Sequence, residues 1–292
     1  MSSINFNSSA TTALQTLRNV NSKLSDTQNA VSTGLKVSSA SDNAAYWSIS
    51  TTMKSDNKAL NAATDSLGVG AAKVDTAYAA MDSAIEVVNE IKTKLTTASE
   101  TSVDKDQVQL EITKLQQQLS AIGQAASFNG ENWVVQSNTA STTSVVDGFI
   151  RESNGAVKVT TASFEAGSYA MFESIDDGEG SGGVLGSVME ISLTSSMTQG
   201  DIDDYMTTVE TALNTLTKGA AALGALSTRI DLQSDFASKI SDAMDAGVSK
   251  LVDADMEEES AKLSALQTQQ QLAVQSLSIA NSSSQTILSL FR

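Results

Sequence analysis

The sequence predicts a mainly α-helical protein, with long antiparallel coiled-coil-like helices from both chain ends and a small β-rich central insert. Apolar residues recur at steps of seven along one long stretch of the chain, which is the period of a coiled coil. Proline, which breaks helix interiors, is absent from all 292 residues. Near the middle, helical spacing gives way to Ser, Thr, Gly and Asn-Gly pairs, which are typical of hairpins.

A first amphipathic helix is expected from about residue 10 to residue 35. Its apolar residues repeat along a single face, so the helix needs a partner to cover that face. Gly34 and the polar residues after it break the pattern, and a short irregular segment should follow. The seam consists of Leu14, Leu17, Leu24, Val31 and Leu35.

The second helix should begin after Ser41 and Asp42, which are good helix caps. Its seam recurs at every seventh position and predicts a helix of about 75 Å at 1.5 Å per residue. The pattern lapses near residues 99–106, and a third helix over about 104–126 should turn back on the second. The second seam consists of Tyr46, Met53, Leu60, Leu67, Val74, Met81, Val88 and Leu95.

The insert is expected from about residue 130 to residue 195 as a small, exposed β-rich region. Asn154-Gly155 lies between two apolar runs, 149–150 and 157–159, which predicts a hairpin. Residues 169–175 and 188–193 alternate between apolar and polar side chains, so two further strands are expected there. The Gly-rich stretch 176–183 should be the loop between them.

The C-terminal half repeats the helical pattern of the N-terminal half. Helical spacing returns at Ile202 and extends to Leu251, and a last helix is expected from Leu263 to Arg292. Its seam advances by alternating steps of four and three. The seam consists of Leu263, Leu266, Gln270, Ala273, Leu277, Ala280, Ser284, Ile287 and Phe291.

Composition excludes several kinds of chemistry. The chain has no cysteine and no histidine, so disulfides, thiolate nucleophiles, imidazole bases and nearly all zinc or haem sites are excluded, and no cofactor is expected. The net charge of −16 disfavours nucleic acid and anionic membrane surfaces as partners. Neither a secretory signal peptide nor a membrane-spanning stretch is expected.

Two clusters of residues resemble ligand sites. The acidic residues between Asp253 and Glu259 match no calcium loop, and carboxylates at the start of a helix are favoured by its dipole, so a helix start is the preferred interpretation. The stretch Asp176–Gly183 lacks the Gly-Lys-Ser/Thr ending of a phosphate-binding loop, and its carboxylates would repel phosphate, so we expect a surface loop.

The seams of the two chain ends predict self-assembly. Each end has one apolar seam and a face rich in Ser, Gln and Asn, and such a helix is marginal alone. Burying one Leu contributes about 1.5–3 kcal/mol, so four or five per helix offset the ordering cost only when copies pack together.

Three motifs closely resemble the bacterial flagellins. The segment from Val31 to Ala45 is similar to the N-terminal signature of the family, and a Phe-Asn-Gly triplet ends the third helix. Ala-Asn and the closing run from Ile287 to Arg292 match the C-terminal end. The motif residues are Gly34, Leu35, Ser41, Asp42, Ala44, Ala45, Phe128, Asn129, Gly130, Ala280 and Asn281.

The resemblance implies a structural subunit, not an enzyme, that self-polymerises into the flagellar filament used for swimming. It implies five segments: an N-terminal filament-core helix (1–40), a helical shell domain (41–128 and 199–252), a β-rich surface-exposed insert (129–198) and a C-terminal filament-core helix (253–292). The implied filament-core interface consists of Leu14, Leu17, Leu24, Val31, Leu35, Leu263, Leu266, Leu277, Ile287 and Phe291.

The implied partners are other copies of the chain and related flagellins, the flagellar export apparatus, an export chaperone, the filament cap and the hook-junction proteins. The implied location is extracellular, in the flagellum, after secretion without a cleaved signal peptide. The short insert is similar to that of the compact alphaproteobacterial flagellins, in which several related flagellins often share one filament.

One segment departs from the family pattern. Flagellins sensed by the vertebrate Toll-like receptor for flagellin carry an Arg-rich stretch late in the second helix. The comparable stretch here has Glu90 where the receptor would meet an Arg, so weak receptor activation is expected. The altered residues are Asn89, Glu90, Ile91, Lys92 and Lys94.

Two alternatives to the filament subunit remain open from the residues. A hook–filament junction protein shares the terminal signatures, and its position in the flagellum would distinguish it. A soluble coiled-coil signalling adaptor would show the same seams but has no reason to keep flagellin-like ends.

Overall fold

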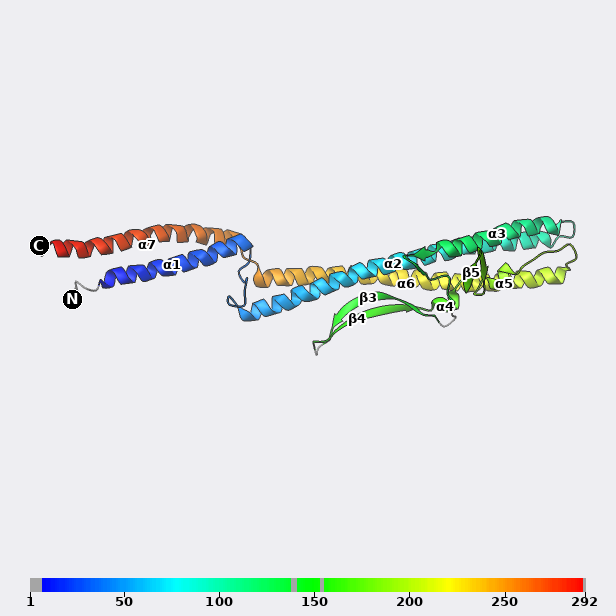
Figure 1. Ribbon diagram of the computed structural model, residues 1–292, viewed down its shortest axis with the longest axis horizontal. Helices are drawn as coiled ribbons and strands as arrows, with labels where there is room; N and C mark the ends of the chain where they lie inside the picture. Colours follow the sequence, from blue (N-terminus) through cyan, green and yellow to red (C-terminus); the bar gives the residue numbers. More distant parts are fainter. Residues whose placement is uncertain (1–6, 138–140, 153–154, 291–292) are drawn as a thin grey trace. The chain divides into compact units, whose positions relative to one another are not determined.

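The structure of the chain, a computed structural model, is described for residues 7–137, 141–152 and 155–290, with side chains described up to residue 282 (Figure 1). The chain forms two compact units. Unit 1 contains residues 1–57 and 242–292, and unit 2 contains residues 58–241. The two longest helices, α2 (Ala44–Ala98) and α6 (Gln199–Val252), each contribute to both units. The prediction of a mainly helical fold with a small β-containing centre is confirmed.

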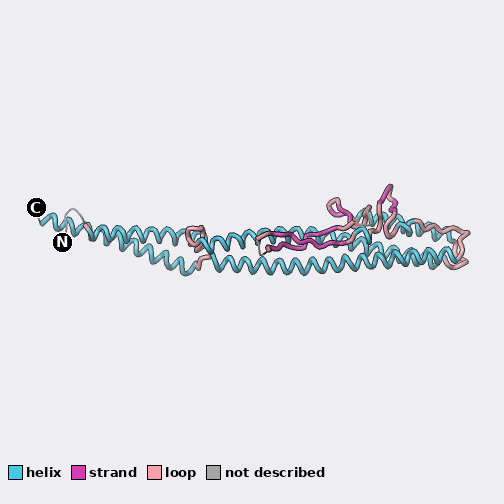
Figure 2. The backbone as a smooth tube through the Cα atoms, turned by 90° about the horizontal axis from the view of Figure 1, so that it is seen from below, coloured by secondary structure: helices cyan, strands magenta, loops and turns pink. Residues whose placement is uncertain are grey.

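Unit 1 is built on an antiparallel pair of helices from the two chain ends. Helix α1 (Ser8–Thr33) and helix α7 (Met256–Leu290) lie side by side in both views (Figures 1 and 2). Asn7 caps α1 by accepting a hydrogen bond from the Ala10 amide, and α1 ends at Gly34, whose φ of 72° is one that glycine adopts without strain. The first helix expected at 10–35 therefore lies at 8–33.

In unit 1, the segment that follows α1 pairs through its backbone with the segment between α6 and α7. Leu35 and Asp253 form an antiparallel bridge, and the Ala254 amide donates to the Gly34 carbonyl at 2.8 Å. The amides of Lys36 and Val37 both donate to the Val252 carbonyl. A small apolar cluster of Val37, Val248 and Val252, with Leu35, Met53 and Leu251 against it, supports this pairing.

Unit 2 packs α2 against α3 (Lys105–Ala125) and α6 around one apolar core. Asp104 caps α3 by accepting from the amides of Asp106 and Gln107. The seven-residue seam of α2 is buried from Leu60 to Leu95, as expected. Its first two members lie in unit 1, where Tyr46 is exposed and Met53 is half-buried.

In the described part of the chain, the strands pair as three antiparallel hairpins. Strand β1 (Ser127–Phe128) pairs with β2 (Glu131–Asn132), β3 (Thr143–Arg151) with β4 (Val157–Phe164), and β5 (Ser174–Asp176) with β6 (Glu179–Ser181). The hairpin expected around residues 149–159 is confirmed, although Asn154 lies outside the described residues. The predicted Gly-rich loop at 176–183 is a loop only in part. Asp177 and Gly178, which have positive φ, form the turn of the third hairpin, whereas Glu179–Ser181 are strand β6.

Two of the expected strands need correction. Residues 188–193 are not a strand: α5 (Gly186–Met189) covers their start and the rest is irregular. Of residues 169–175, only the end joins a strand, and residue 169 closes the short helix α4 (Ala166–Tyr169). The reason is that side chains of α3 satisfy the backbone groups that strands would pair. Gln116 Nε2 lies 3.0, 3.2 and 3.0 Å from the carbonyl oxygens of Val188, Met189 and Ile191.

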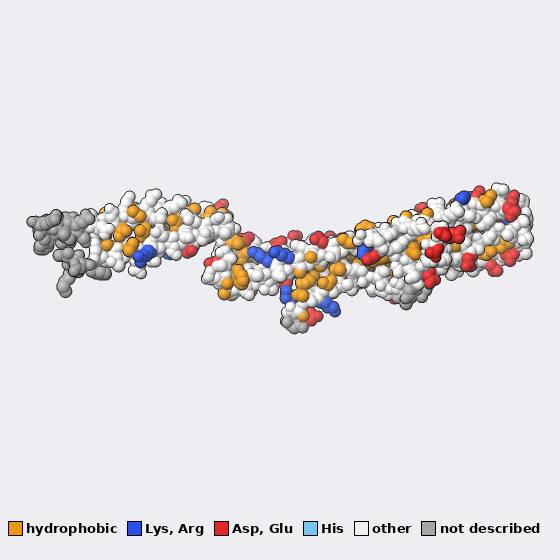
Figure 3. Space-filling model, viewed as in Figure 1, with side chains coloured by type: hydrophobic (Ala, Val, Ile, Leu, Met, Phe, Trp, Pro, Cys, Tyr) orange, Lys and Arg blue, Asp and Glu red, His pale blue; other side chains and the backbone are white. Residues whose placement is uncertain are grey.

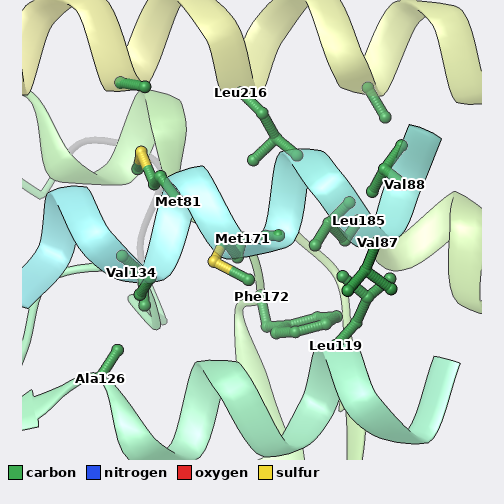
Figure 4. Packing of buried hydrophobic residues seen from close by; sticks show 14 of the residues in the cluster. Met81, Val87, Val88, Leu119, Ala126, Val134, Met171, Phe172, Leu185 and Leu216 are labelled. Atoms are coloured by element: carbon green, nitrogen blue, oxygen red, sulfur yellow. The ribbon is translucent and has the colours of Figure 1, made fainter. Parts of the chain in front are cut away.

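The expectation of an exposed insert is also wrong for much of its length. Phe172, Met171, Leu185 and Val134 are completely buried and lie among side chains of α2, α3 and α6 (Figure 4). Trp133 is buried too and stacks on Phe164, with ring centroids 6.1 Å apart. The three helices leave space that these large residues fill, so the insert belongs to the core of unit 2. Among the residues of the insert that the structure describes, the large aliphatic ones that stay exposed are in the outer half of the β3–β4 hairpin.

We expect Gln116→Leu to lower the free energy of unfolding of unit 2 by about 1–3 kcal/mol, because three backbone carbonyls would lose their donor. Gln118→Leu, on an exposed face of the same helix, is the matched control and should change it by less than about 0.5 kcal/mol. Urea unfolding followed by circular dichroism measures both. Equal effects of the two substitutions would contradict a structural role for the Gln116 amide.

Candidate assembly surface

The buried seam of the α1–α7 pair uses most of the residues that the sequence singled out. On α1, Leu24 is buried and Leu17 and Val31 are half-buried, and Leu35 is half-buried just beyond the helix. On α7, the half-buried members are Leu263, Leu266 and Leu277, with Ala273 buried between them.

Val20 is a seam residue that sequence reasoning missed. It is as buried as Leu24. The seam of α1 advances by steps of three and four, 17, 20, 24, 27 and 31, and the buried Thr27 lies on it as well. The steps of seven from Leu17 to Leu24 and from Leu24 to Val31 pass over both residues, whereas an alternating step of three and four includes them.

Polar contacts fix the register of the two helices. The amide of Gln270 donates to Asn21 Oδ1 at 2.8 Å, and Asn7 Nδ2 donates to the Ala280 carbonyl at 2.9 Å. A polar residue on a coiled-coil seam specifies which partners face each other, at a cost in stability. These two contacts, one at the N-cap of α1 and one at Asn21 within the helix, both favour the observed alignment of the chain ends.

A second set of apolar side chains lies on the outer surface of the pair. On α7, the exposed fractions are 59% for Leu272, 52% for Val274 and 69% for Ile279. On α1, Leu14, which was expected on the seam, is 37% exposed. Helix α7 therefore has apolar residues on more than one face, which one partner helix cannot cover. We call these four residues the outer stripe.

Part of the expected interface lies outside the described residues. Phe291 is one such residue, and the side chains of Ser284 and Ile287 fall in the last part of α7, where only the backbone is described. The role of these three residues stays a prediction.

The motif residues in the segment between α1 and α2 are arranged around one carboxylate oxygen. Asp42 Oδ2 accepts hydrogen bonds from the amides of Ser38 and Ser39 at 3.0 and 2.9 Å and from both of their hydroxyls. These donors favour the charged form and lower the pKa of Asp42, the Ser39 amide contributing most. Ser41 bonds the Ser39 hydroxyl, and Ala44 and Ala45 begin α2 on an exposed face.

The remaining motif residues have structural positions. Asn129 and Gly130 form the turn between β1 and β2 with φ values of 51° and 83°, and Phe128 is half-buried beside them. Ala280 accepts the hydrogen bond from Asn7, and Asn281 is exposed. A two-residue turn with positive φ at both positions favours Asn-Gly, which explains the motif physically.

The acidic cluster 253–259 serves the start of α7. Asp255 Oδ1 accepts from the amides of Glu257 and Glu258, and Lys262 bonds the carboxylates of Glu258 and Glu259 at 2.9 and 2.8 Å. Those two carboxylates raise the pKa of Lys262. Within the described residues, no group of three acidic side chains is arranged to hold a metal ion. The preferred interpretation as a helix start fits these contacts.

The segment that departs from the flagellin pattern is neutralised within unit 2. Lys94 lies 2.8 Å from Glu111 and 3.5 Å from Glu90, and the contact with Glu111 is the main cause of its raised pKa. Lys92 lies 2.5 Å from Glu210. Ile91 points into the core and Asn89 is exposed.

The helices described here are not of the kind that cross a lipid bilayer: none combines the length and apolar character that a span requires.

These features define a class: a coiled-coil structural protein whose two chain ends pair and leave apolar residues on the outside. Two family models match the chain. The model of the bacterial flagellin N-terminal helical region matches residues 4–139, and that of the bacterial flagellin C-terminal helical region matches residues 206–291.

Curated relatives agree along the whole chain. The chain is 43% identical to Flagellin A of Rhizobium meliloti strain 1021 over 394 aligned positions and 43% identical to its Flagellin C over 320. It is 46% identical to a flagellin of Brucella melitensis biotype 1 over 295 positions. Each alignment covers 100% of both chains. The chain belongs to the bacterial flagellin family and is a structural subunit of the flagellar filament. The junction-protein and adaptor alternatives are not favoured.

Asp42→Ala should destabilise unit 1 at pH 7, because it removes the acceptor of four hydrogen bonds. The folded-state pKa of Asp42 lies below the ordinary 3.8, so its charged form stabilises the fold above pH 3.8. This contribution is lost as the pH falls from 3.8 through the folded-state value. The unfolding midpoint of the variant should therefore lie below that of the unaltered chain at pH 7 and approach it below pH 3.8.

Urea unfolding at a series of pH values measures this difference, with Asp26→Ala, an exposed site on α1, as the control. A difference that stays constant from pH 7 to pH 3 would show that the charge of Asp42 is not responsible.

Proposed function

We propose that helices α1 and α7 form the core of the flagellar filament when copies of this chain polymerise, through the outer stripe. The observation that carries the proposal is that α7 packs one apolar seam on α1 and exposes further apolar residues elsewhere. Full burial of a Leu, Ile or Val contributes about 1.5–3 kcal/mol. The outer stripe offers four such residues, three of them more than half exposed, and the unburied part of this energy becomes available only when other helices cover them.

The segments keep the roles implied by the family. Residues 1–40 and 253–292 supply the core helices, residues 41–128 and 199–252 the surrounding helical shell, and residues 129–198 the insert between them. The core interface combines the seam of the α1–α7 pair with the outer stripe. Ile287 and Phe291 extend it toward the chain end. The register contacts at Asn21 and Asn7 support this proposal, because a fixed alignment gives every copy the same outer surface.

The proposed partners beyond the chain itself are related flagellins in the same filament, the export apparatus, a chaperone for the C-terminal segment, the filament cap and the hook-junction proteins. Export without a cleaved signal leads to the extracellular filament. The outer stripe of the terminal helices stays exposed to water until copies of the chain pack together. Such an exposed apolar surface is a reason for a chaperone to bind it.

Ile279→Asp should reduce filament assembly at least about tenfold, because a carboxylate would replace an apolar contact between copies. Unit 2 should stay folded, since Ile279 belongs to unit 1. Sedimentation and electron microscopy of polymerised protein measure the effect. Ser260→Asp, at an exposed position in the first turn of α7 away from the outer stripe, adds the same charge as a control and should assemble normally.

Leu277→Asp should block assembly as well, but by opening the α1–α7 seam. Normal assembly of both Ile279→Asp and Leu277→Asp would contradict the proposed core. Electron microscopy of filaments sheared from source cells, with mass spectrometry, gives the independent test: the chain should be found along the whole filament and not only at its base.

We also expect weak activation of the vertebrate Toll-like receptor for flagellin. Glu90 and Glu111 neutralise Lys94, so the exposed face of this segment has no unbalanced positive charge of the kind an Arg-rich stretch would present. A reporter-cell assay with purified protein measures the response. Glu90→Arg should raise it, and a potent response from the unaltered chain would contradict the prediction.

A further inference from the structure

The Asn-Gly turn between β1 and β2 places two unengaged groups next to each other in the chain. Asn129 and Gly130 are both exposed. Within the described residues, the Asn129 side chain forms no hydrogen bond and the Gly130 amide has no acceptor. The nearby Asn132 differs: its Nδ2 donates to the Gly123 carbonyl at 2.6 Å and its Oδ1 accepts from the Val134 amide at 3.0 Å. The side-chain carbonyl of Asn129 can therefore react with the backbone that follows it.

These two groups are the reactants of a spontaneous covalent reaction of the protein backbone. A backbone nitrogen attacks the side-chain carbonyl carbon of the preceding Asn and loses its proton to solvent. The amide nitrogen of the side chain leaves as ammonia, which closes a succinimide ring. Water then adds to one of the two ring carbonyls and opens the ring, giving either Asp or isoaspartate. Glycine after Asn favours the ring, because no Cβ hinders the attacking nitrogen.

We propose that the Asn129–Gly130 turn is a site of spontaneous modification, at which Asn129 converts to isoaspartate and Asp while the chain is folded. The reactants are the Asn129 side chain, the Gly130 nitrogen and water, so the reaction needs neither an enzyme nor a cofactor. The modification does not depend on the proposed filament function and belongs to unit 2 alone.

The short strands beside the turn make the reactive conformation accessible. Ring closure requires the backbone at Asn129 to rotate out of its turn geometry, in which its φ is 51°. Strands β1 and β2 have two residues each, and a two-stranded hairpin of this size is marginally stable. Local opening of such a hairpin costs little free energy. The folded chain therefore reaches the reactive conformation without unfolding unit 2.

The second Asn-Gly pair of the chain, Asn154-Gly155, provides an internal comparison. Asn154 lies outside the described residues, so the comparison concerns the attacking nitrogen and the flanking strands. The Gly155 amide donates to the Glu152 carbonyl at 2.9 Å. Strands β3 and β4 on either side have nine and eight residues. Because this nitrogen is hydrogen-bonded and the strands are long, we expect Asn129 to react faster than Asn154.

Conversion would place a new carboxylate beside an existing ion pair. Lys73 of α2 lies 2.7 Å from Glu131, and a carboxylate at position 129 would compete for the same ammonium group. Isoaspartate also lengthens the main chain, so the two-residue turn could no longer hold Phe128 opposite Glu131. Figure 3 shows acidic side chains along the visible face of unit 2, so the new charge is added to a surface of the same sign. We therefore expect modification to separate β1 from β2.

The first test incubates the folded chain at mildly alkaline pH in water labelled with a heavy oxygen isotope. Each conversion incorporates an oxygen atom from water, and mass spectrometry of peptides locates it. Asn129 should convert at least about fivefold faster than Asn154 in the folded chain. In urea both pairs should convert at similar rates, because the hydrogen bond at Gly155 is lost. Conversion of Asn154 as fast as that of Asn129 in the folded chain, or no conversion of Asn129, would overturn the proposal.

The second test measures the consequence for unit 2. Asn129→Gly is the matched control, because a Gly-Gly turn keeps positive φ at both positions but has no side chain to react. After the same incubation, the urea midpoint of unfolding should fall for the unaltered chain and stay constant for Asn129→Gly. The fall should increase with the fraction of isoaspartate. An equal fall in both chains would show that the damage lies elsewhere and would overturn the assigned effect on the β1–β2 hairpin.

Discussion

The structure depends on the apolar seam of α2. Between Leu60 and Leu95 this seam is buried at every seventh residue, and α3, α6 and the insert are arranged around it. Because the residues are Ala, Leu, Val, Ile and Met with few aromatics, the core is narrow and follows the helix. A narrow core needs close approach of backbones, which is why glycines and alanines recur along these faces: an added Cβ on Gly219 would meet Tyr169 at 2.9 Å and Met81 at 3.1 Å.

The irregular part of the insert has backbone N–H and C=O groups that no neighbouring strand pairs. Polar side chains of α3 form hydrogen bonds with these groups. Gln109 accepts from the Leu193 amide, Gln116 donates to three carbonyls, and Ser120 accepts from the Gly180 amide. These residues lie on one face of α3 and act as a row of partners for backbone that has no strand beside it. The helix thereby replaces a missing sheet edge, because buried backbone groups need partners of some kind.

The sequence was sufficient to predict the elements with strong periodicity and clear ends. The helices, the β3–β4 hairpin and the antiparallel chain ends follow from seam spacing, the lack of proline and one Asn-Gly pair. Residues 188–193 were predicted wrongly because an alternating pattern there reflects burial against α3, and no local signal identifies Gln116 as the partner of its carbonyls. The burial of Met171 and Phe172 was not predicted, because the space that they fill between α2, α3 and α6 arises only when the three helices pack together. In the assembly surface, Leu14 was placed on the seam because its spacing fits, whereas the helix pair leaves it partly exposed.

The two tryptophans of the chain are distributed between the two units. Trp133 is buried in unit 2 against Phe164, whereas Trp47 is 39% exposed at the first turn of α2 in unit 1. An indole in an apolar stack and an indole in contact with water emit at different wavelengths, so one emission spectrum contains a separate signal from each unit. Replacing either tryptophan with phenylalanine would leave a native optical reporter of the remaining unit, through which folding of the chain ends and of the central unit could be followed independently, without an attached dye.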